Sequence, residues 1–258
     1  MTRIIAVCLP KGGTAKTSTT LNLGAALAER GQRVLLIDFD PQANLSQSLG
    51  IDPDTHERNI YAALKRLLTS YDVRLNDMIT PTTSGVDLVP GTALLNLANE
   101  ELALALEREK ALKKLLASTQ GYDFIIVDTL PYLGVLTVNA LVAAQEVLIP
   151  LQAEYLATKS TKLILDHVDV IRRAGLNPDL HVVGILLTMV DQRLIINREV
   201  IEYAIKTLGT RVPIFGTQIR RSVRVPESQA YHQSILQYDS TGPVAAGYRA
   251  LAEEVLHA

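Results

Sequence analysis

The sequence predicts an α/β fold, a doubly wound and mostly parallel sheet flanked by helices. Short β-branched apolar runs alternate with longer segments of helical period along the whole chain. The runs are continuously hydrophobic instead of alternating, which is typical of strands that are buried on both faces. In sheets of this kind, ligands bind beyond the carboxyl ends of the strands.

Six apolar runs are the predicted strands: residues 4–9, 34–37, 86–89, 124–127, 147–151 and 182–190. The predicted helices between and after them are residues 17–30, 93–117, 158–174, 198–208 and 244–258. Three of these helices are followed by glycine, the usual residue just past a helix end: Gly31, Gly175 and Gly209. Residues 51–83 are the least regular part of the chain, so we expect an insertion or a mobile cap there.

Composition narrows the class of protein. With 258 residues, 48% of them hydrophobic and 20% charged, the chain resembles an ordinary globular protein, and we expect one domain over residues 1–258. The single cysteine, Cys8, excludes a disulfide framework and indicates a core position in a reducing compartment. The first apolar run is too short for a signal peptide, and no run reaches 18 residues, so we expect a cytoplasmic protein with no membrane partner.

A phosphate-binding loop is predicted directly after the first strand. Its residues run from Pro10 to Thr17, and its two glycines let the backbone approach a phosphate closely. Lys16 can reach the outer phosphates, and the Thr17 hydroxyl can bind Mg²⁺. Pro10 and Ala15 stand where the strict motif has glycine, so a simple Gly-Gly turn before a helix is the alternative.

Two other predicted strands end in carboxylates. Asp38 and Asp40 follow residues 34–37, and Asp128 follows residues 124–127. An aspartate after a buried strand can enter the shell of a bound Mg²⁺, although such an aspartate often caps a helix instead. Three of them in a chain with a phosphate loop indicate one site for a nucleotide and Mg²⁺.

These motifs resemble the deviant Walker A ATPases of the ParA/MinD superfamily, and most closely the short, Soj-type ParA proteins. The segments that carry the resemblance extend over nearly the whole chain: residues 11–24, 38–44, 128–134, 150–155, 188–191 and 219–224, then Glu227 and the C-terminal helix. The resemblance implies a P-loop NTPase fold that hydrolyses ATP with Mg²⁺.

The resemblance also implies roles for single residues. ATP would contact eight loop residues: Lys11, Gly12, Gly13, Thr14, Ala15, Lys16, Thr17 and Ser18. Lys11 would reach the nucleotide of a second protomer, and Lys16 would bind phosphate within its own protomer. Thr17, Asp38 and Asp128 would hold or support the Mg²⁺, and Asp40 would position the attacking water. Pro10 and Ala15 depart from the family pattern, and they bear on nucleotide affinity and turnover.

A basic region lies near the C-terminus. Residues 193–224 hold seven basic and two acidic residues, a net charge of +5. Since the whole chain has a net charge of −2, the remaining residues carry −7. Such asymmetry is typical of a face that binds DNA phosphates, although each arginine alone fits an ordinary solvated surface. By resemblance, the DNA-binding residues are Arg198, Arg220, Arg221 and Arg224. With no aromatic stacking platform evident in the sequence, we expect sequence-independent binding to double-stranded DNA.

The resemblance implies a partition ATPase associated with the nucleoid. ATP would drive homodimerisation and DNA binding, and a ParB-like or adaptor protein would stimulate slow hydrolysis and release. The alternatives are positioning of a protein cargo, a small-molecule synthetase, and a homologue that Ala15 has inactivated. A MinD-like membrane ATPase needs a basic C-terminal helix, whereas residues 244–258 hold only Arg249. An iron–sulfur reductase needs several cysteines.

Overall fold

The computed structural model describes residues 2–70, 73–152, 157–191 and 193–258, with their side chains except those of residues 70, 157, 158, 195, 196 and 198. Within these residues, eight strands form one sheet in the order β3-β4-β2-β5-β1-β6-β7-β8. All neighbouring pairs are parallel except β3 and β4. The predicted doubly wound sheet is confirmed.

The strands of the sheet have the following bounds: β1 Arg3–Val7, β2 Val34–Phe39, β3 Thr80–Pro81, β4 Asp87–Val89, β5 Phe124–Thr129, β6 Glu146–Gln152, β7 His181–Val190 and β8 Ile214–Arg220. Six of them correspond to the six predicted runs. The predicted strands do not include β3 and β8, which lie at the two edges of the sheet. Both lack a continuous apolar run, because an edge strand is covered less completely than a central one.

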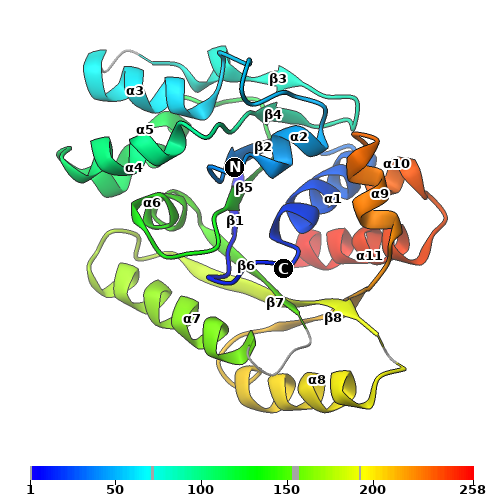
Figure 1. Cartoon of the computed structure of the whole chain (residues 1–258). Coiled ribbons are helices and arrows are strands. Elements are labelled where there is room, and N and C mark those ends of the chain that lie inside the picture. Colours follow the sequence, from blue (N-terminus) through cyan, green and yellow to red (C-terminus); the bar gives the residue numbers. More distant parts are fainter. Residues whose placement is uncertain (1, 71–72, 153–156, 192) are drawn as a thin grey trace.

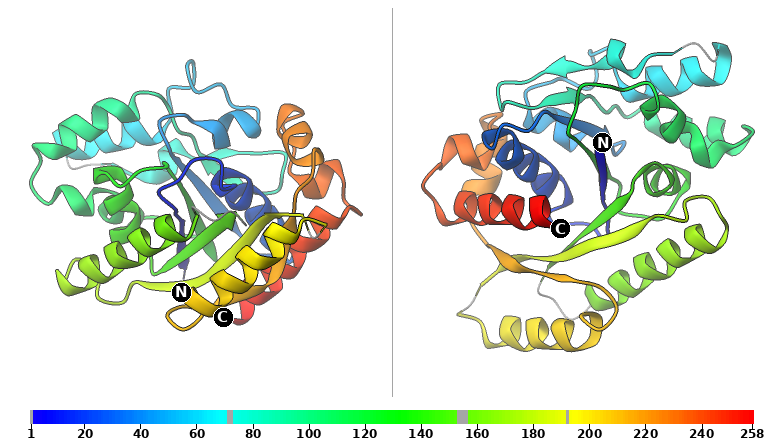
Figure 2. Two further views of the ribbon diagram at one scale, coloured as in Figure 1. Left: turned by 60° about the horizontal axis from the view of Figure 1, so that its bottom comes forward. Right: turned by 180° about the vertical axis from the view of Figure 1, so that it is seen from behind.

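Helices pack on both faces of the sheet (Figures 1 and 2). Their bounds are α1 Lys16–Glu29, α2 Asn44–Ser48, α3 Ile60–Ser70, α4 Leu95–Ala103, α5 Ala111–Leu116, α6 Val135–Ala143, α7 Ala157–Arg173, α8 Ile195–Leu208, α9 Arg224–Ala230, α10 Ile235–Tyr238 and α11 Pro243–His257, with 3₁₀ turns η1 Leu75–Met78 and η2 Arg108–Lys110. Figure 1 shows α3–α7 on one side of the sheet and α1, α10 and α11 on the other.

Two hydrophobic cores, one on each face, account for the continuous apolar runs. Along β1, Ile5 and Val7 pack against α1 and α11, whereas Ala6, and Cys8 directly after the strand, face the layer of α3–α7. Side chains on a strand alternate between the two faces, so the middle of a strand with a core on each side has no polar position. Cys8 is buried, and burial raises the pKa of its thiol to about 11, as suits a core residue.

One expected helix was wrong. Residues 93–117 are not one helix, because α4 ends at Ala103 and the chain turns at Glu107, whose φ of 52° is left-handed. Lys110 and Lys114 both pair with the Glu107 carboxylate, a contact that has no sequence signal. In the irregular stretch 51–83, α3 buries Ile60 and Leu64 in the core, and the expected insertion or mobile cap stays a prediction.

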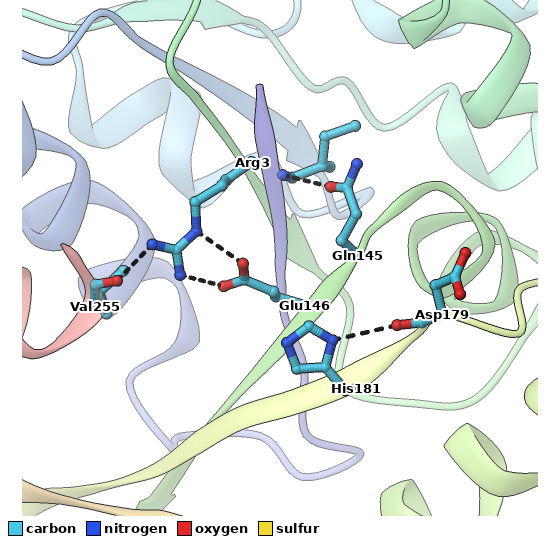
Figure 3. A network of polar contacts seen from close by, with 7 residues as sticks. Arg3, Gln145, Glu146, Asp179, His181 and Val255 are labelled. Carbon is cyan, nitrogen blue, oxygen red and sulfur yellow. Dashed lines mark hydrogen bonds and ion pairs between the residues drawn. The ribbon is translucent and has the colours of Figure 1, made fainter. Parts of the chain in front are cut away.

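The amino ends of the strands are joined to α11 through one arginine (Figure 3). The Arg3 guanidinium donates to both Glu146 oxygens at 2.8 Å and to the Val255 carbonyl at 2.6 Å. It also lies over the Phe124 ring, 5.3 Å from the centroid. Arg3 therefore ties β1, β6 and α11 together at the edge of the sheet opposite the loop between β1 and α1.

No helix in the described ranges is long and apolar enough to span a bilayer. Those ranges also contain no cluster of three or more His, Cys, Asp or Glu that could hold a metal by itself.

Candidate functional site

The predicted site residues meet at the carboxyl edge of the three central strands. β5 lies between β1 and β2, and its Asp128 is the register partner of both Val7 and Asp38. The loop that follows β1 therefore lies beside two carboxylates that are far apart in the sequence. Parallel pairing is the reason, since it brings the ends of neighbouring strands to one edge.

The loop between β1 and α1 has two residues with left-handed backbone, Gly13 at φ 73° and Ala15 at φ 66°. Glycine adopts this conformation freely, whereas alanine does so at a cost of about 1–2 kcal/mol. Ala15 is the N-cap of α1 and makes no side-chain cap. Ala15, which stands where the strict motif has glycine, therefore adopts the glycine-like backbone at the cost of strain. The loop still leads into the N-terminus of a 14-residue helix.

Lys16 lies inside the loop, with only 7% of its surface exposed. Its Nζ donates to the Lys11 carbonyl at 2.9 Å, and the Thr14 hydroxyl points to the same oxygen. Burial lowers the pKa of Lys16, while the nearby charge of Asp128 opposes this shift. A buried ammonium that is hydrogen-bonded to a carbonyl is well placed to exchange that carbonyl for a phosphate oxygen.

Asp128 connects to the first turns of α1. Its carboxylate accepts the Thr17 hydroxyl at 2.7 Å and the Thr20 hydroxyl at 3.4 Å. Asp128 is fully buried, and burial together with the neighbouring Asp38 raises its pKa to about 8. A carboxylate and a hydroxyl in contact are the oxygen ligands that Mg²⁺ prefers, so these residues fit the predicted metal site.

Asp38 is held in place by the segment that follows β2. It accepts hydrogen bonds from the Ser46 amide at 2.8 Å and the Ser46 hydroxyl at 2.6 Å. Gly91 packs so closely on Asp38 that a methyl group there would lie 2.8 Å from the carboxyl carbon. Burial raises the pKa of Asp38 to about 6, since these two hydrogen bonds offset only part of the desolvation.

Asp40 lines the cleft beside the loop, unlike Asp38. Its Oδ1 accepts the Gln42 amide at 2.9 Å, which fixes the carboxylate. Burial raises its pKa, and the charge of Lys16 acts in the opposite direction. The position beside Lys16 is suited to orienting a water near a bound phosphate.

The cleft has a volume of about 590 Å³. Its floor is the loop from Gly12 to Ser18, and its walls come from the segment around α2, from the turn after β5, from the end of β7 and from the end of α9 with the turn after it. The wall residues are Asp40, Gln42, Asn44, Gln47, Ser48, Pro131, Met189, Gln229, Ala230 and His232. Met189, Gln229 and His232 were not predicted as site residues, because they follow the loop by more than 170 positions and only folding brings them there. Lys11 is half-buried nearby, and its role toward a second protomer stays a prediction.

The basic cluster of Arg220, Arg221 and Arg224 lies where β8 leads into α9, and all three arginines are exposed. Arg220 and Arg221 line a second hollow of about 560 Å³, which shares Ser18 and Gln229 with the first. Arg224 donates to Glu227 at 3.2 Å. Arg198 lies on α8, but its side chain is outside the described part, so its predicted role stays a prediction.

An aromatic pair that has no signal in the sequence lies beside this cluster. The rings of Tyr231 and Tyr238 stack with centroids 5.6 Å apart, and Tyr231 is exposed. The Tyr238 hydroxyl donates to Glu227, the same carboxylate that pairs with Arg224.

Comparisons with known proteins agree with this geometry. A family model described as an AAA domain matches residues 2–182. The sporulation initiation inhibitor protein Soj of Bacillus subtilis (strain 168) is 41% identical over 257 residues, covering 99% of this chain and 98% of Soj. The chain belongs to the ParA/Soj family of ATPases.

Further relatives match this ParA/Soj ATPase over nearly its whole length. The chromosome partitioning protein ParA of Myxococcus xanthus (strain DK1622) is 39% identical and covers 98% of this chain, with 88% of its own length matched. A crystal structure titled as the cobyrinic acid a,c-diamide synthase of Mycobacterium smegmatis, with bound ADP and magnesium, is 36% identical with a TM-score of 0.85. It covers 100% of this chain and 95% of its own. The same neighbour has also been solved with an ATP analogue and magnesium.

Proposed function

We propose that this ParA/Soj ATPase binds ATP and Mg²⁺ in the cleft and uses the nucleotide to control dimerisation and DNA binding. The observation that carries the proposal is the convergence of Lys16, Thr17, Asp40 and Asp128 at one end of the sheet. Phosphoryl transfer depends on positioning and charge neutralisation, and this group of residues offers both. The relatives bound to ADP and to an ATP analogue support the choice of nucleotide.

Each site residue has a physical role in this proposal. The amides of the loop and of the first turn of α1 receive the phosphates, and Lys16 leaves the Lys11 carbonyl to bind them. Thr17 and Asp128 hold the Mg²⁺, and Asp38 supports them from β2. The bound metal neutralises charge on the phosphates. Asp40 orients the water that attacks, and Lys11 contacts the nucleotide of the second protomer.

The proposed product of ATP binding is a homodimer that binds double-stranded DNA without sequence preference. The exposed arginines at the start of α9 support this step, because they lie next to the cleft and carry positive charge. A ParB-like or adaptor protein then stimulates hydrolysis and releases the dimer from the nucleoid. The cargo in this cycle is a chromosome or a plasmid, and a protein assembly is the alternative.

Two other functions follow from different chemistry. A small-molecule synthetase is favoured by the name of the Mycobacterium smegmatis neighbour alone, and it gives no role to the arginine cluster. A MinD-like membrane ATPase would use a basic terminal helix, whereas Arg249 on α11 is paired with Glu29 at 2.6 Å.

The test is the binding of two unrelated DNA duplexes by fluorescence anisotropy, with ATP, with ADP and without nucleotide. We expect binding with ATP only, equally tight for both duplexes and weaker at higher salt. Lys16→Ala is the nucleotide-blind control and should bind neither ATP nor DNA. Equal DNA binding with and without ATP, or none at low salt, would contradict the proposed function and leave the synthetase as the better hypothesis.

A further inference from the structure

Helix α9 touches both the nucleotide cleft and the basic cluster. Its first residue is Arg224, and its last turn places Gln229 and Ala230 in the wall of the cleft. A helix of seven residues is about 10 Å long, and backbone hydrogen bonds tie its turns together. We therefore expect a displacement at one end of α9 to reach the other end.

The cleft end of α9 is bound to the first turn of α1. The Gln229 side chain donates from Nε2 to the Ser18 hydroxyl at 3.1 Å. Ser18 directly follows Thr17, so it belongs to the turn that receives the phosphates. One turn further, the buried Asn22 accepts the Ile235 amide at 2.8 Å and donates to the Ser18 carbonyl at 2.8 Å.

The same end of α9 also contacts the opposite wall of the cleft. The Nδ1 atom of His232 lies 2.8 Å from the carbonyl of Gln47, which is on α2. The backbone of His232 has a φ of 56°, a left-handed conformation that is strained for a residue with a side chain and persists only where the surrounding contacts fix it. α2 follows the segment of Asp40, so the turn after α9 joins the two walls between which the phosphates would lie.

The other end of α9 is bound to the segment that carries the arginines. The Arg224 amide donates to the Ser222 hydroxyl at 3.1 Å, and the Arg221 amide donates to the Val190 carbonyl at 3.1 Å. Val190 is the last residue of β7, one position after the cleft residue Met189. The segment that carries the arginines is therefore attached both to α9, through Arg224, and to the strand end beside the cleft, through Arg221.

We propose that Gln229 is a positioning residue that couples the nucleotide cleft to DNA binding. Its hydrogen bond to Ser18 sets the position of α9, so phosphate binding at the first turn of α1 determines how Arg221 and Arg224 face DNA. The proposal rests on the proposed function and adds the element that transmits the nucleotide signal.

The test uses Gln229→Ala, Ser18→Ala and the double variant in the full chain. DNA affinity is measured with ATP saturating for each variant, which removes any change in ATP affinity from the comparison. Loss of one hydrogen bond corresponds to roughly 2- to 10-fold weaker DNA binding. We expect this loss in both single variants and no further loss in the double variant, because the two residues share one contact.

A second readout does not involve DNA. Hydrogen exchange of residues 220–232 is compared with and without ATP. We expect an ATP-induced change in the wild type that is absent in Gln229→Ala and in Gln229→Asn, whose amide reaches less far. Gln233→Ala, an exposed glutamine of the same segment, is the matched control and should behave like the wild type. A merely structural role of Gln229 would lower the unfolding temperature without removing the ATP-induced difference.

Three results would overturn the proposal: wild-type DNA affinity in Gln229→Ala, additive losses in the double variant, or an ATP-induced exchange change that persists without the glutamine. Failure of the proposed function looks different, since the wild type itself would then not bind DNA with ATP, while the exchange experiment would still report on the coupling.

Discussion

At the scale of single residues, the site combines a strained backbone at Ala15 with two buried carboxyl groups on the neighbouring strands. Ala15 holds a left-handed backbone that its methyl group disfavours. Asp38 and Asp128 are fully buried, and burial raises the pKa of each carboxyl, to about 6 for Asp38 and about 8 for Asp128. A cation bound beside these carboxylates would favour their charged forms.

The strain at Ala15 is measurable. Ala15→Gly should leave the free energy of unfolding unchanged or raise it by up to about 1 kcal/mol, because relief of the left-handed strain offsets the added entropy of the unfolded chain. Ala28→Gly, next to the last residue of the same helix, is the control and should lower the free energy of unfolding by at most about 1 kcal/mol, because Ala28 has no left-handed backbone to relieve. Urea unfolding measures the free energy of unfolding of both variants. An equal decrease in the two would contradict the strain at Ala15.

Asp40→Ala should separate ATP binding from hydrolysis. The phosphate loop and the Thr17–Asp128 pair stay intact, so ATP should still bind and the dimer should still form. Phosphate release should fall by ~10²–10⁴-fold, the usual effect of losing a group that assists proton transfer. Glu57→Ala, which removes an exposed carboxylate elsewhere, is the control. An unchanged rate in Asp40→Ala with the stimulating partner present would refute the role.

At the scale of elements, arginines occur in two different settings, one within the packed structure and one on its surface. Arg3 closes the amino edge of the sheet against α11, and its partner Glu146 has only 8% of its side chain exposed. The cluster of Arg220, Arg221 and Arg224 faces solvent beside α9. The first contact is expected to act on stability and the second on ligand binding.

Arg3→Met should destabilise the fold by about 2–3 kcal/mol, because it leaves a nearly buried carboxylate and the Val255 carbonyl without their donor. The value lies below the 3–5 kcal/mol of a fully buried pair because Arg3 keeps 26% of its side chain exposed. Arg33→Met, which breaks an exposed pair with Asp123, should destabilise the fold much less than Arg3→Met, because water screens the exposed charges. Equal losses for the two variants in urea unfolding would argue against the buried contact.

Replacement of Arg221 and Arg224 by alanine should weaken DNA binding about equally on unrelated sequences. Each lost phosphate contact should also reduce the slope of log K against log salt by roughly 0.9 in magnitude. ATP binding should persist, since neither arginine lines the nucleotide cleft. A salt titration of the double variant with ATP is the measurement, and wild-type affinity and slope would show that these are ordinary surface charges.

At the scale of the whole molecule, one sheet carries both ligand regions. The cleft lies at the ends of β1, β2 and β5, and the arginines lie after the edge strand β8. α1 and α11 pack together on the same face, so the two ends of the chain share a core (Figure 2). We propose that residues 1–258 form a single domain, and one cooperative unfolding transition would support this.

Lys11→Ala tests the proposed dimer. The variant should bind ATP as a monomer, because Lys16 and the loop amides remain, but it should not assemble with ATP. Light scattering with ATP should therefore show the wild type at twice the mass of the variant. Lys65→Ala, an exposed lysine on α3, is the control and should dimerise. An ATP dimer of normal stability without Lys11 would remove its role toward the second protomer.

Local patterns were enough to predict the sheet and the loop. Buried strands read as continuous apolar runs, and the lysine, threonine and aspartates stand at strand ends or in the first turn of a helix, which are positions that the local chain sets. The edge strands, the break at Glu107 and the cleft wall of Met189, Gln229 and His232 could not be found in this way. They depend on contacts between distant segments, such as Glu107 with two lysines and Gln229 with Ser18, and such pairings exist only once the chain has folded.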